Sequence, residues 1–312
     1  MAADGAGRVR RFSDRLADSI LRRRSVVCVG LDPVLERLPP QVRPQAAATA
    51  AAEAAAAVAA AFREFCCGVI SAVADVAACV KPQAAFFEQY GAAGWQALAD
   101  VVRCAREHDL PVIVDAKRGD IASTAAAYAA ALFDGAPGPQ GPLAGLGADA
   151  VTVNPYLGED ALEPFVARCA GGHGVFVLVR TSNPGAAGLQ ELDAGGRPLY
   201  LRVADLVARL GAAHVGEHGY SDVGAVAGAT APTSLAAVRQ ALPQAFLLVP
   251  GYGAQGGGAA AVRGLAAGDA AGLVVNASRS VIYAWQQDGG DYRRAAARAA
   301  EAMRDELARV VW

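Results

Sequence analysis

Short apolar runs alternate with longer segments of helical length along the whole chain. Each run is almost continuously apolar rather than alternating, which is typical of parallel strands that are covered on both faces. The eight runs are VVCVGLDP (26–33), ACVKPQ (78–83), VIVDAKRGDI (112–121), DAVTVNPY (149–156), VFVLVRTSNPG (175–185), DVGAVAGAT (222–230), AFLLVPGYGAQGGG (245–258) and AGLVVNASRS (271–280). Eight strand-then-helix units in sequence predict an α/β fold, a single-domain (β/α)8 TIM barrel.

The segments between the runs predict the helices that surround such a barrel. Residues 46–63 are almost all alanine, and residues 84–108 carry large apolar side chains at broadly helical spacing. Two connections, 134–147 and 183–198, exceed the usual length. The first is rich in glycine and proline and is expected to be an ordinary connector. The second follows a strand end and is either a lid or a plain flexible loop.

No long linker divides the chain, so we expect one catalytic barrel domain over residues 26–312. Residues 1–25 are expected to form a helical extension that lies in solvent before the first strand. This extension is rich in arginine, but no apolar segment follows it, and Asp14 and Asp18 argue against a transit peptide.

Composition and charge exclude several classes of function. Hydrophobic residues make up 54% of the 312 residues and charged residues 19%, which is ample material for a large core. The net charge of −2 gives no basic footprint for nucleic acid or an anionic membrane surface. The longest apolar runs, such as residues 245–249, look too short to span a bilayer.

The six cysteines predict a reducing compartment, hence the cytoplasm. They show no Cys-x-x-Cys or Cys/His spacing that suggests zinc, and a chain of this length needs no disulfides. Cys28 and Cys79 fall inside apolar runs, where a free thiol behaves as a small buried hydrophobic group.

Polar residues collect at the C-terminal ends of the predicted strands. In chain order they are Asp32, Lys81, Asp115, Lys117, Asn154, Ser182, Gln255, Asn276, Ser278 and Arg279. Any one of them could be a loop residue that hydrates a strand end. Together they predict an active site, because catalytic groups of these barrels converge at the C-terminal face.

The most informative segment is DAKRGDI (115–121). Strand side chains alternate between faces, so Asp115 and Lys117 are expected to point the same way, with Asp120 just past the strand. Two carboxylates beside one lysine favour its charged ammonium form. Such a lysine can donate a proton to a developing carbanion, but it is a poor Schiff-base nucleophile. The alternative is a surface salt-bridge turn.

A second signal points to a phosphorylated ligand. PGYGAQGGG (250–258) predicts a glycine-rich turn that opens a helix after the seventh strand. NASRS (276–280) lies at a predicted helix start after the eighth strand and contains Arg279. Loops after these two strands are the usual phosphate site of TIM barrels, where helix N-termini and arginine bind anions.

At these residues the chain resembles the orotidine 5′-phosphate decarboxylase family, in its longer bacterial subgroup (type 2). The most specific element is Asp-x-Lys-x-x-Asp, which here consists of Asp115, Lys117 and Asp120, followed by Ile121 and Thr124. The other matching segments are GLDP (30–33), VKPQAAFFE (80–88), RTSNPGA (180–186), PGYGAQGG (250–257) and NASRSVIYA (276–284).

The resemblance implies a homodimer that converts orotidine 5′-monophosphate to uridine 5′-monophosphate and carbon dioxide in pyrimidine biosynthesis. It places a charged tetrad on Lys81, Asp115, Lys117 and Asp120, with Asp120 supplied by the neighbouring subunit. Lys117 would protonate C6 of the pyrimidine. The resemblance implies that the ribose is bound by Asp32 and Lys81, together with Thr124 of the partner subunit. It places Ser182 at the pyrimidine, Gln255 and Arg279 at the phosphate, and Gly253 and Ser278 as further contacts.

This chemistry agrees with the residue types. Loss of carbon dioxide leaves a carbanion with no adjacent carbonyl to delocalise it, and a fixed ammonium in a water-excluded site is the strongest help available. No metal-ligand cluster or cofactor fingerprint is visible in the sequence, so neither a metal nor an organic cofactor is expected.

Two other functions stay open at this point. Sugar-phosphate synthases and aldolases on related barrels also carry Asp-x-Lys-x-x-Asp, but those that use Mg²⁺ need another acidic ligand near strand two, where this chain has Lys81. A non-catalytic phosphosugar-binding barrel would leave the Asp115, Lys117 and Asp120 array without a purpose.

Overall fold

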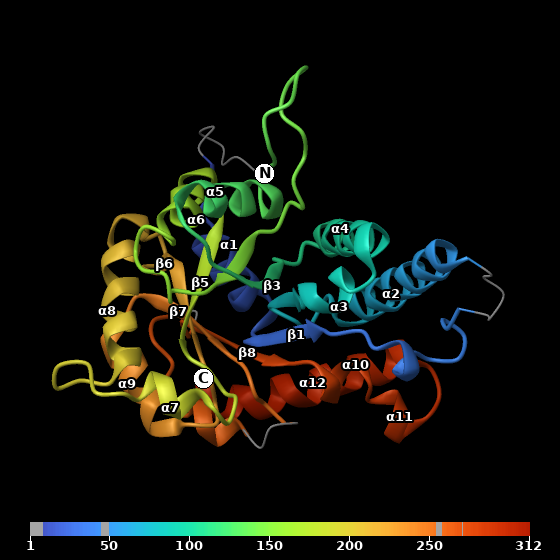
Figure 1. Cartoon of the computed structure of the whole chain (residues 1–312). Coiled ribbons are helices and arrows are strands. Elements are labelled where there is room, and N and C mark those ends of the chain that lie inside the picture. Colours follow the sequence, from blue (N-terminus) through green and yellow to red (C-terminus); the bar gives the residue numbers. More distant parts are fainter. Residues whose placement is uncertain (1–8, 45–49, 254–257, 270) are drawn as a thin grey trace.

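The computed structural model describes residues 9–44, 50–253, 258–269 and 271–312. In this part of the chain eight parallel strands form a barrel with helices on the outside (Figure 1). The strands are β1 (Val27–Leu31), β2 (Cys79–Pro82), β3 (Ile113–Arg118), β4 (Ala150–Val153), β5 (Gly174–Arg180), β6 (Ser221–Ala227), β7 (Ala245–Val249) and β8 (Leu273–Ala277). All eight predicted strands and the TIM-barrel fold are therefore confirmed.

The sheet runs in the order β2-β1-β8-β7-β6-β5-β4-β3, and its two ends meet. Parallel bridges pair Val80 with Val112 and Gln83 with Asp115, so β2 lies beside β3 and nearly closes the ring. Every residue of β1, β2, β4, β6, β7 and β8 is buried. Burial on both faces explains why the runs are continuously apolar rather than alternating.

The helices cover the outside of the barrel and follow the predicted segments. They are α2 (Ala51–Val73), α3 (Ala84–Glu88), α4 (Gly91–Glu107), α5 (Ala122–Leu132), α6 (Glu163–Val166), α7 (Ala186–Gln190), α8 (Leu199–Gly211), α9 (Pro232–Ala241), α10 (Arg279–Ile282), α11 (Trp285–Asp288) and α12 (Tyr292–Val311). The expected helix over 84–108 is two helices. Gly91, at φ +60°, takes the left-handed conformation at the junction, which glycine adopts without strain.

The expectation that no apolar segment could span a bilayer is wrong for α2. This helix has 23 residues and is long and apolar enough to cross a membrane by length and composition alone. In the fold it packs against α4 and α12 and buries Phe62, Phe65 and Ile70. The apolar side chains of α2 therefore pack this helix against the rest of the fold.

The N-terminal helix α1 (Phe12–Arg23) is present, but the expectation that it is solvated is wrong. Phe12, Leu16 and Ile20 are fully buried, and the ring of Phe12 meets that of Phe176 edge to face at 6.0 Å. These side chains recur every four residues and so form one apolar stripe on the helix. The stripe covers the N-terminal end of the barrel.

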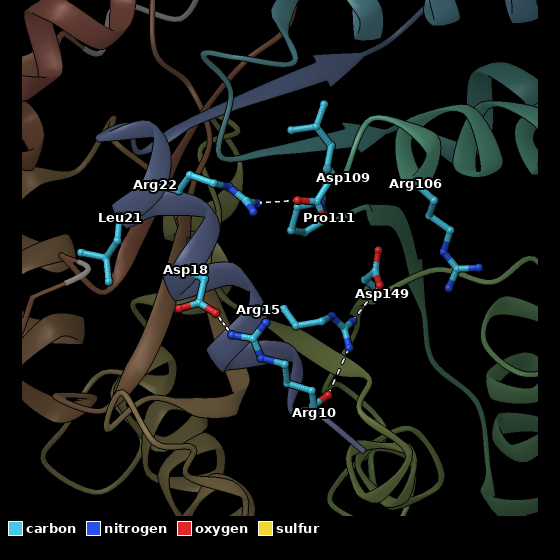
Figure 2. Close-up of a pocket in the computed structure, with 10 residues that line it drawn as sticks. Arg10, Arg15, Asp18, Leu21, Arg22, Arg106, Asp109, Pro111 and Asp149 are labelled. Carbon is cyan, nitrogen blue, oxygen red and sulfur yellow. Dashed lines mark hydrogen bonds and ion pairs between the residues drawn. The ribbon is translucent and has the colours of Figure 1, made fainter. Parts of the chain in front are cut away.

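A cavity of about 700 Å³ adjoins α1 at this end (Figure 2). Its charged groups bind one another: Arg15 pairs with Asp149 at 2.7 Å, Arg22 with Asp109 at 2.8 Å, and Arg10 with Asp18. The pairs with Asp149 and Asp109 fasten α1 to the segments that precede β4 and β3, and the pair of Arg10 with Asp18 ties α1 to the residues just before it. Among the described residues, the polar groups that the sequence placed at the strand ends lie at the opposite, C-terminal end of the barrel.

Candidate active site

A second cavity, of about 460 Å³, lies at the C-terminal ends of the strands. It brings together seven predicted site residues from five different strand ends: Asp32, Lys81, Asp115, Lys117, Ser182, Ser278 and Arg279. Asn276, whose polar side chain the strand-end pattern singled out, also lines it. The convergence predicted from the strand ends therefore exists in the fold.

The end of β3 departs from a regular strand in a way that positions Lys117. β3 pairs with β4 at Val114 and again at Arg118, while β4 advances by only two residues between these pairs. The extra residues form a bulge, and Lys117 takes a left-handed conformation with φ +47°. For a non-glycine residue this conformation costs about 1–3 kcal/mol and is found most often at functional sites. Asp115 and Lys117 both face the cavity, as predicted, but the bulge places them there instead of the regular alternation of side chains along a strand.

Asp115 is the centre of the site. Its Oδ2 accepts hydrogen bonds from Nζ of Lys81 at 2.8 Å and from Nε2 of Gln83 at 3.1 Å. Its Oδ1 accepts from Nζ of Lys117 at 2.6 Å and from the hydroxyl of Thr152 at 2.8 Å. All acceptor positions of one buried carboxylate are thereby occupied, which fixes two ammonium groups at known places.

The two lysines differ in their access to the cavity. The side chain of Lys81 is 6% exposed and that of Asp115 is 9% exposed, whereas that of Lys117 is 45% exposed. Both lysines line the cavity, but Lys117 is the more accessible to a ligand, while Lys81 is largely buried against Asp115 and neutralises its charge. Lys81 and Lys117 are the only lysines in the chain.

The electrostatics keep this cluster charged. Burial alone would raise the pKa of Asp115, but the ammonium groups of Lys81 and Lys117 hold it well below its usual range. Burial alone would lower the pKa of Lys81, but the carboxylates of Asp115 and Asp32 raise it above its usual value. Each buried charge thus exists because its partner does.

Asp32 lies in the loop after β1 and has an oxygen to offer a ligand. Its Oδ1 is buried and has no hydrogen-bond partner in the described part of the chain. The loop itself is fixed, because the hydroxyl of Tyr283 donates to the backbone oxygen of Asp32 at 3.0 Å and accepts from the N–H of Val34 at 2.8 Å. A buried, unpaired carboxylate oxygen is costly unless a donor arrives. Ligand hydroxyls are such donors.

Gly30 allows β1 to pass against the β8 side of the cavity. A Cβ atom at this position would lie 1.9 Å from the hydroxyl of Ser278. Arg279 follows Ser278 on the rim, is exposed, and makes no ion pair with the residues that the structure describes. A free guanidinium beside a hydroxyl is suited to an anion.

The helix start predicted at NASRS after β8 is confirmed, because α10 begins at Arg279, although this helix has a single turn. After β7 the described segment is a short 3-10 helix, Ala259–Val262, instead of the expected helix. Pro250, Gly251 and Tyr252 line the cavity, and Gly253 follows just outside its lining. Gln255 lies outside the described residues.

The segment 183–198 is more ordered than a plain flexible loop. It contains α7, and the side chain of Gln190 accepts from the N–H of Thr181 at 2.9 Å and donates to its hydroxyl at 2.8 Å. Glu191 pairs with Arg180 at 2.9 Å. Asn183 and Gln190 also line the cavity, so the segment contributes to the site, and its role as a lid stays a prediction.

Asp120 and Thr124 lie outside the lining of the cavity, as do Gly253 and the strand-end residue Asn154. Within the described chain the carboxylate of Asp120 accepts only the N–H of Ile121, at 2.8 Å, and Thr124 is exposed on the first turn of α5. Within the described chain Lys117 pairs with Asp115 and not with Asp120, so the expectation that two carboxylates of one chain flank Lys117 is wrong.

Gln83 and Thr152 were missed by the sequence analysis. Thr152 also accepts the backbone N–H of Lys117 at 2.9 Å, so it supports the bulge and the carboxylate together. Each is a polar residue within or beside an otherwise apolar strand, and that pattern could have marked both. A further overlooked signal is that both lysines of the chain fall at strand ends.

The sequence and the fold of this chain match a family of known proteins. Residues 25–295 match the model of the orotidine 5′-phosphate decarboxylase / HUMPS family. The orotidine 5′-phosphate decarboxylase of Rhodopirellula baltica is 47% identical over 278 residues, which cover 89% of this chain and 90% of that protein. That of Roseiflexus castenholzii is 42% identical and covers 95% of this chain and 97% of its own length. The solved OMP decarboxylase of Leishmania donovani superposes with a TM-score of 0.72 at 35% identity, over 96% of this chain and 98% of that one.

The depressed pKa of Asp115 predicts how acid affects stability. A carboxylate of this kind stabilises the fold above its unfolded pKa, near 4, and the contribution is lost as pH falls toward the folded value. Below about pH 4 the free energy of unfolding should fall more steeply in the wild type than in Asp115→Asn, by up to about 1.4 kcal/mol per pH unit. Urea unfolding at a series of pH values from 6 to 2.5 measures the two slopes. Asp160→Asn, which loses one exposed carboxylate, is the reference, and equal slopes in wild type and Asp115→Asn would contradict the assignment.

Proposed function

The chain belongs to the orotidine 5′-phosphate decarboxylase / HUMPS family, and we propose that its C-terminal cavity converts orotidine 5′-monophosphate to uridine 5′-monophosphate through Lys117. The activity is that of a carboxy-lyase of pyrimidine biosynthesis. The observation that supports the proposed mechanism best is the half-exposed ammonium of Lys117, held 2.6 Å from a buried carboxylate.

In the reaction the bond between C6 of the pyrimidine and the carboxyl carbon breaks, and carbon dioxide leaves. The electron pair stays on C6, which takes a proton from Nζ of Lys117, and Lys117 then regains a proton from solvent. A fixed ammonium stabilises the negative charge that develops at C6, and it does so most effectively in a site that excludes water. Asp115 positions this ammonium and also lies close to the substrate carboxylate, while Lys81 keeps Asp115 charged.

The remaining groups divide the substrate between them. Asp32 has a buried oxygen without a partner among the described residues, and this oxygen would accept hydrogen bonds from the ribose hydroxyls, while the ammonium of Lys81 would donate to a ribose oxygen. Ser182, at the end of β5, would contact the pyrimidine. The phosphate would bind to Arg279 and Gln255, with Ser278 and Gly253 as further contacts, and its binding energy would help to close the site.

The homodimer is part of the same proposal. Asp120 and Thr124 do not reach the cavity of their own chain, yet they lie on its rim beside Ile121, whose apolar side chain is 60% exposed. Tyr156 and Leu157, after the neighbouring strand β4, are exposed as well. Exposed apolar groups that gather in one region mark interfaces. A two-fold contact there would deliver Asp120 and Thr124 of the partner subunit to the opposite cavity.

The cavity supports a reaction without a metal or organic cofactor. Among the described residues that line it, the charged groups are two ammoniums, one guanidinium and two carboxylates, and one of these carboxylates already binds both ammoniums. A magnesium-dependent synthase would need an acidic ligand near strand two, where Lys81 stands. We place the enzyme in the cytoplasm, because all six cysteines are free thiols.

A decarboxylation assay tests the function and the role of Lys117 together. Wild type should decarboxylate orotidine 5′-monophosphate equally well with and without EDTA. Lys117→Ala should lower kcat by at least about 10³-fold while the folded protein still binds uridine 5′-monophosphate. Lys117→Arg, which keeps the positive charge but holds its proton too tightly to donate it, should also remain nearly inactive.

Two outcomes would count against this proposal. Activity that EDTA abolishes and Mg²⁺ restores would favour the synthase chemistry. Near-normal turnover of Lys117→Ala would remove Lys117 from its role as proton donor.

A subunit-exchange experiment tests the shared site. Lys117→Ala and Asp120→Ala are mixed in equal amounts under conditions that allow exchange. About half of the dimers are then mixed, and each has one site with both residues intact, so about a quarter of the wild-type activity should return. If exchange is confirmed independently and activity stays at the level of the separate variants, each site is built by one chain.

A further inference from the structure

Three groups that commonly bind metals meet at the N-terminal end of the barrel, opposite the catalytic cavity. The ligand atoms of Cys169, His214 and Asp222 all lie within 4.8 Å of one another. Cys169 belongs to the short helix before β5, His214 to the short helix before β6, and Asp222 is the second residue of β6. The proposed decarboxylation uses none of them.

The buried carboxylate of Asp222 is held in place by α1 and by the residue before it. Its Oδ1 accepts hydrogen bonds from the N–H and the hydroxyl of Ser13, both at 2.9 Å, and its Oδ2 pairs with Arg11 at 2.9 Å. Carboxylates that bind metals are usually oriented by such outer hydrogen bonds. The side chain of Arg11 is 35% exposed, so it can turn toward solvent if a cation takes its place.

The imidazole of His214 has no hydrogen-bond partner in the described part of the chain. It is half-buried and lies beside a buried thiol and a buried carboxylate. A histidine ring in such surroundings normally donates or accepts a hydrogen bond, because an unpaired polar group loses its solvation without compensation. A metal ion would use the free nitrogen.

We propose that Cys169, His214 and Asp222 bind Zn²⁺, with water as the fourth ligand. Thiolate sulfur, imidazole nitrogen and carboxylate oxygen are each donors that bind four-coordinate zinc, and the soft thiolate disfavours Mg²⁺ and Ca²⁺. On binding, the Cys169 thiol loses its proton to solvent, so thiolate and carboxylate together balance the charge of the ion. A cavity of about 530 Å³ borders Cys169 and gives the ion and the water a path from solvent.

The site would fasten the barrel where α1 covers it. It joins the segments before β5 and β6 directly, and it reaches α1 through the hydrogen bonds of Ser13 to Asp222. A ligand that binds only the folded chain raises its stability. We therefore expect a structural role for the ion and none in decarboxylation.

Cobalt spectroscopy tests the proposal on the full chain. Co²⁺ added to reduced wild type should give the visible bands of four-coordinate cobalt and a thiolate-to-cobalt charge-transfer band, and Zn²⁺ should abolish both. Cys169→Ser should lose the charge-transfer band, and His214→Gln should bind Co²⁺ at least about tenfold more weakly. Arg11→Gln should bind Co²⁺ at least as tightly as wild type, since its guanidinium competes for Asp222.

Two matched controls address the competing sites. Cys67 and Cys104 share a side-chain hydrogen bond across α2 and α4, and His218 lies between Asp18 and Asp269. Cys104→Ser and His218→Ala should keep the wild-type cobalt spectrum. If the spectrum disappears in Cys104→Ser and persists in Cys169→Ser, the thiol pair is the metal site and the proposal is wrong.

Thermal unfolding gives a second measurement that does not depend on the absorption spectrum of cobalt. Zn²⁺ in about hundredfold excess over its Kd should raise the Tm of wild type, Cys104→Ser and His218→Ala by about 4 °C. The Tm of Cys169→Ser should not respond, while its decarboxylase activity equals that of wild type. An equal rise in Cys169→Ser and wild type, or no cobalt spectrum in folded wild type, would overturn the proposal.

Discussion

The bonding of one buried carboxylate to two ammonium groups is the constraint on which the rest of the site depends. Asp115 is buried at the end of β3 and binds both Lys81 and Lys117. Burial of such charges costs more than their attraction returns unless every hydrogen-bonding position is satisfied. Gln83 and Thr152 complete the set, so the cluster is stable as a unit and each member is poorly replaceable.

The fold supplies this arrangement through local irregularity on a regular scaffold. The barrel brings β2, β3 and β4 side by side, which places Lys81, Asp115 and Thr152 within reach of one another. The bulge then lifts Lys117 out of the strand pattern so that its side chain is half exposed in the cavity while its ammonium stays on Asp115. Strain in the backbone of Lys117 is held by the hydrogen bond of its N–H to Thr152. The two ends of the barrel are thus used differently: α1 closes one, and the other holds the chemistry.

Much of this could be predicted from the sequence, because burial on both faces leaves a continuous apolar run for each strand and the polar residues then mark the strand ends. Asp32, Lys81, Asp115, Lys117, Ser182, Ser278 and Arg279 were found in this way. The bulge could not be found, because the left-handed conformation of Lys117 is imposed by its neighbours and has no glycine to signal it. The burial of α1 could not be predicted from its charge, because the arginines of this segment indicate solvent exposure while the stripe of Phe12, Leu16 and Ile20 packs against the barrel. The group of Cys169, His214 and Asp222 has no motif spacing, since only the fold brings these residues together.

The central claim is that Asp115 holds both lysines as charged partners, and the two-lysine composition of the chain allows a direct test. Protein labelled with ¹³C and ¹⁵N in lysine gives side-chain NMR signals from Lys81 and Lys117 only. In wild type the signal of Lys81 should keep its protonated position well above pH 10.5, the usual lysine value, because the carboxylates outweigh the effect of burial. In Asp115→Asn both signals should shift, and Lys81 should titrate at a pH clearly lower than in wild type, since burial then dominates. If the titration of Lys81 were the same in both proteins, or if only one signal moved, Asp115 would not be the group that organises the site.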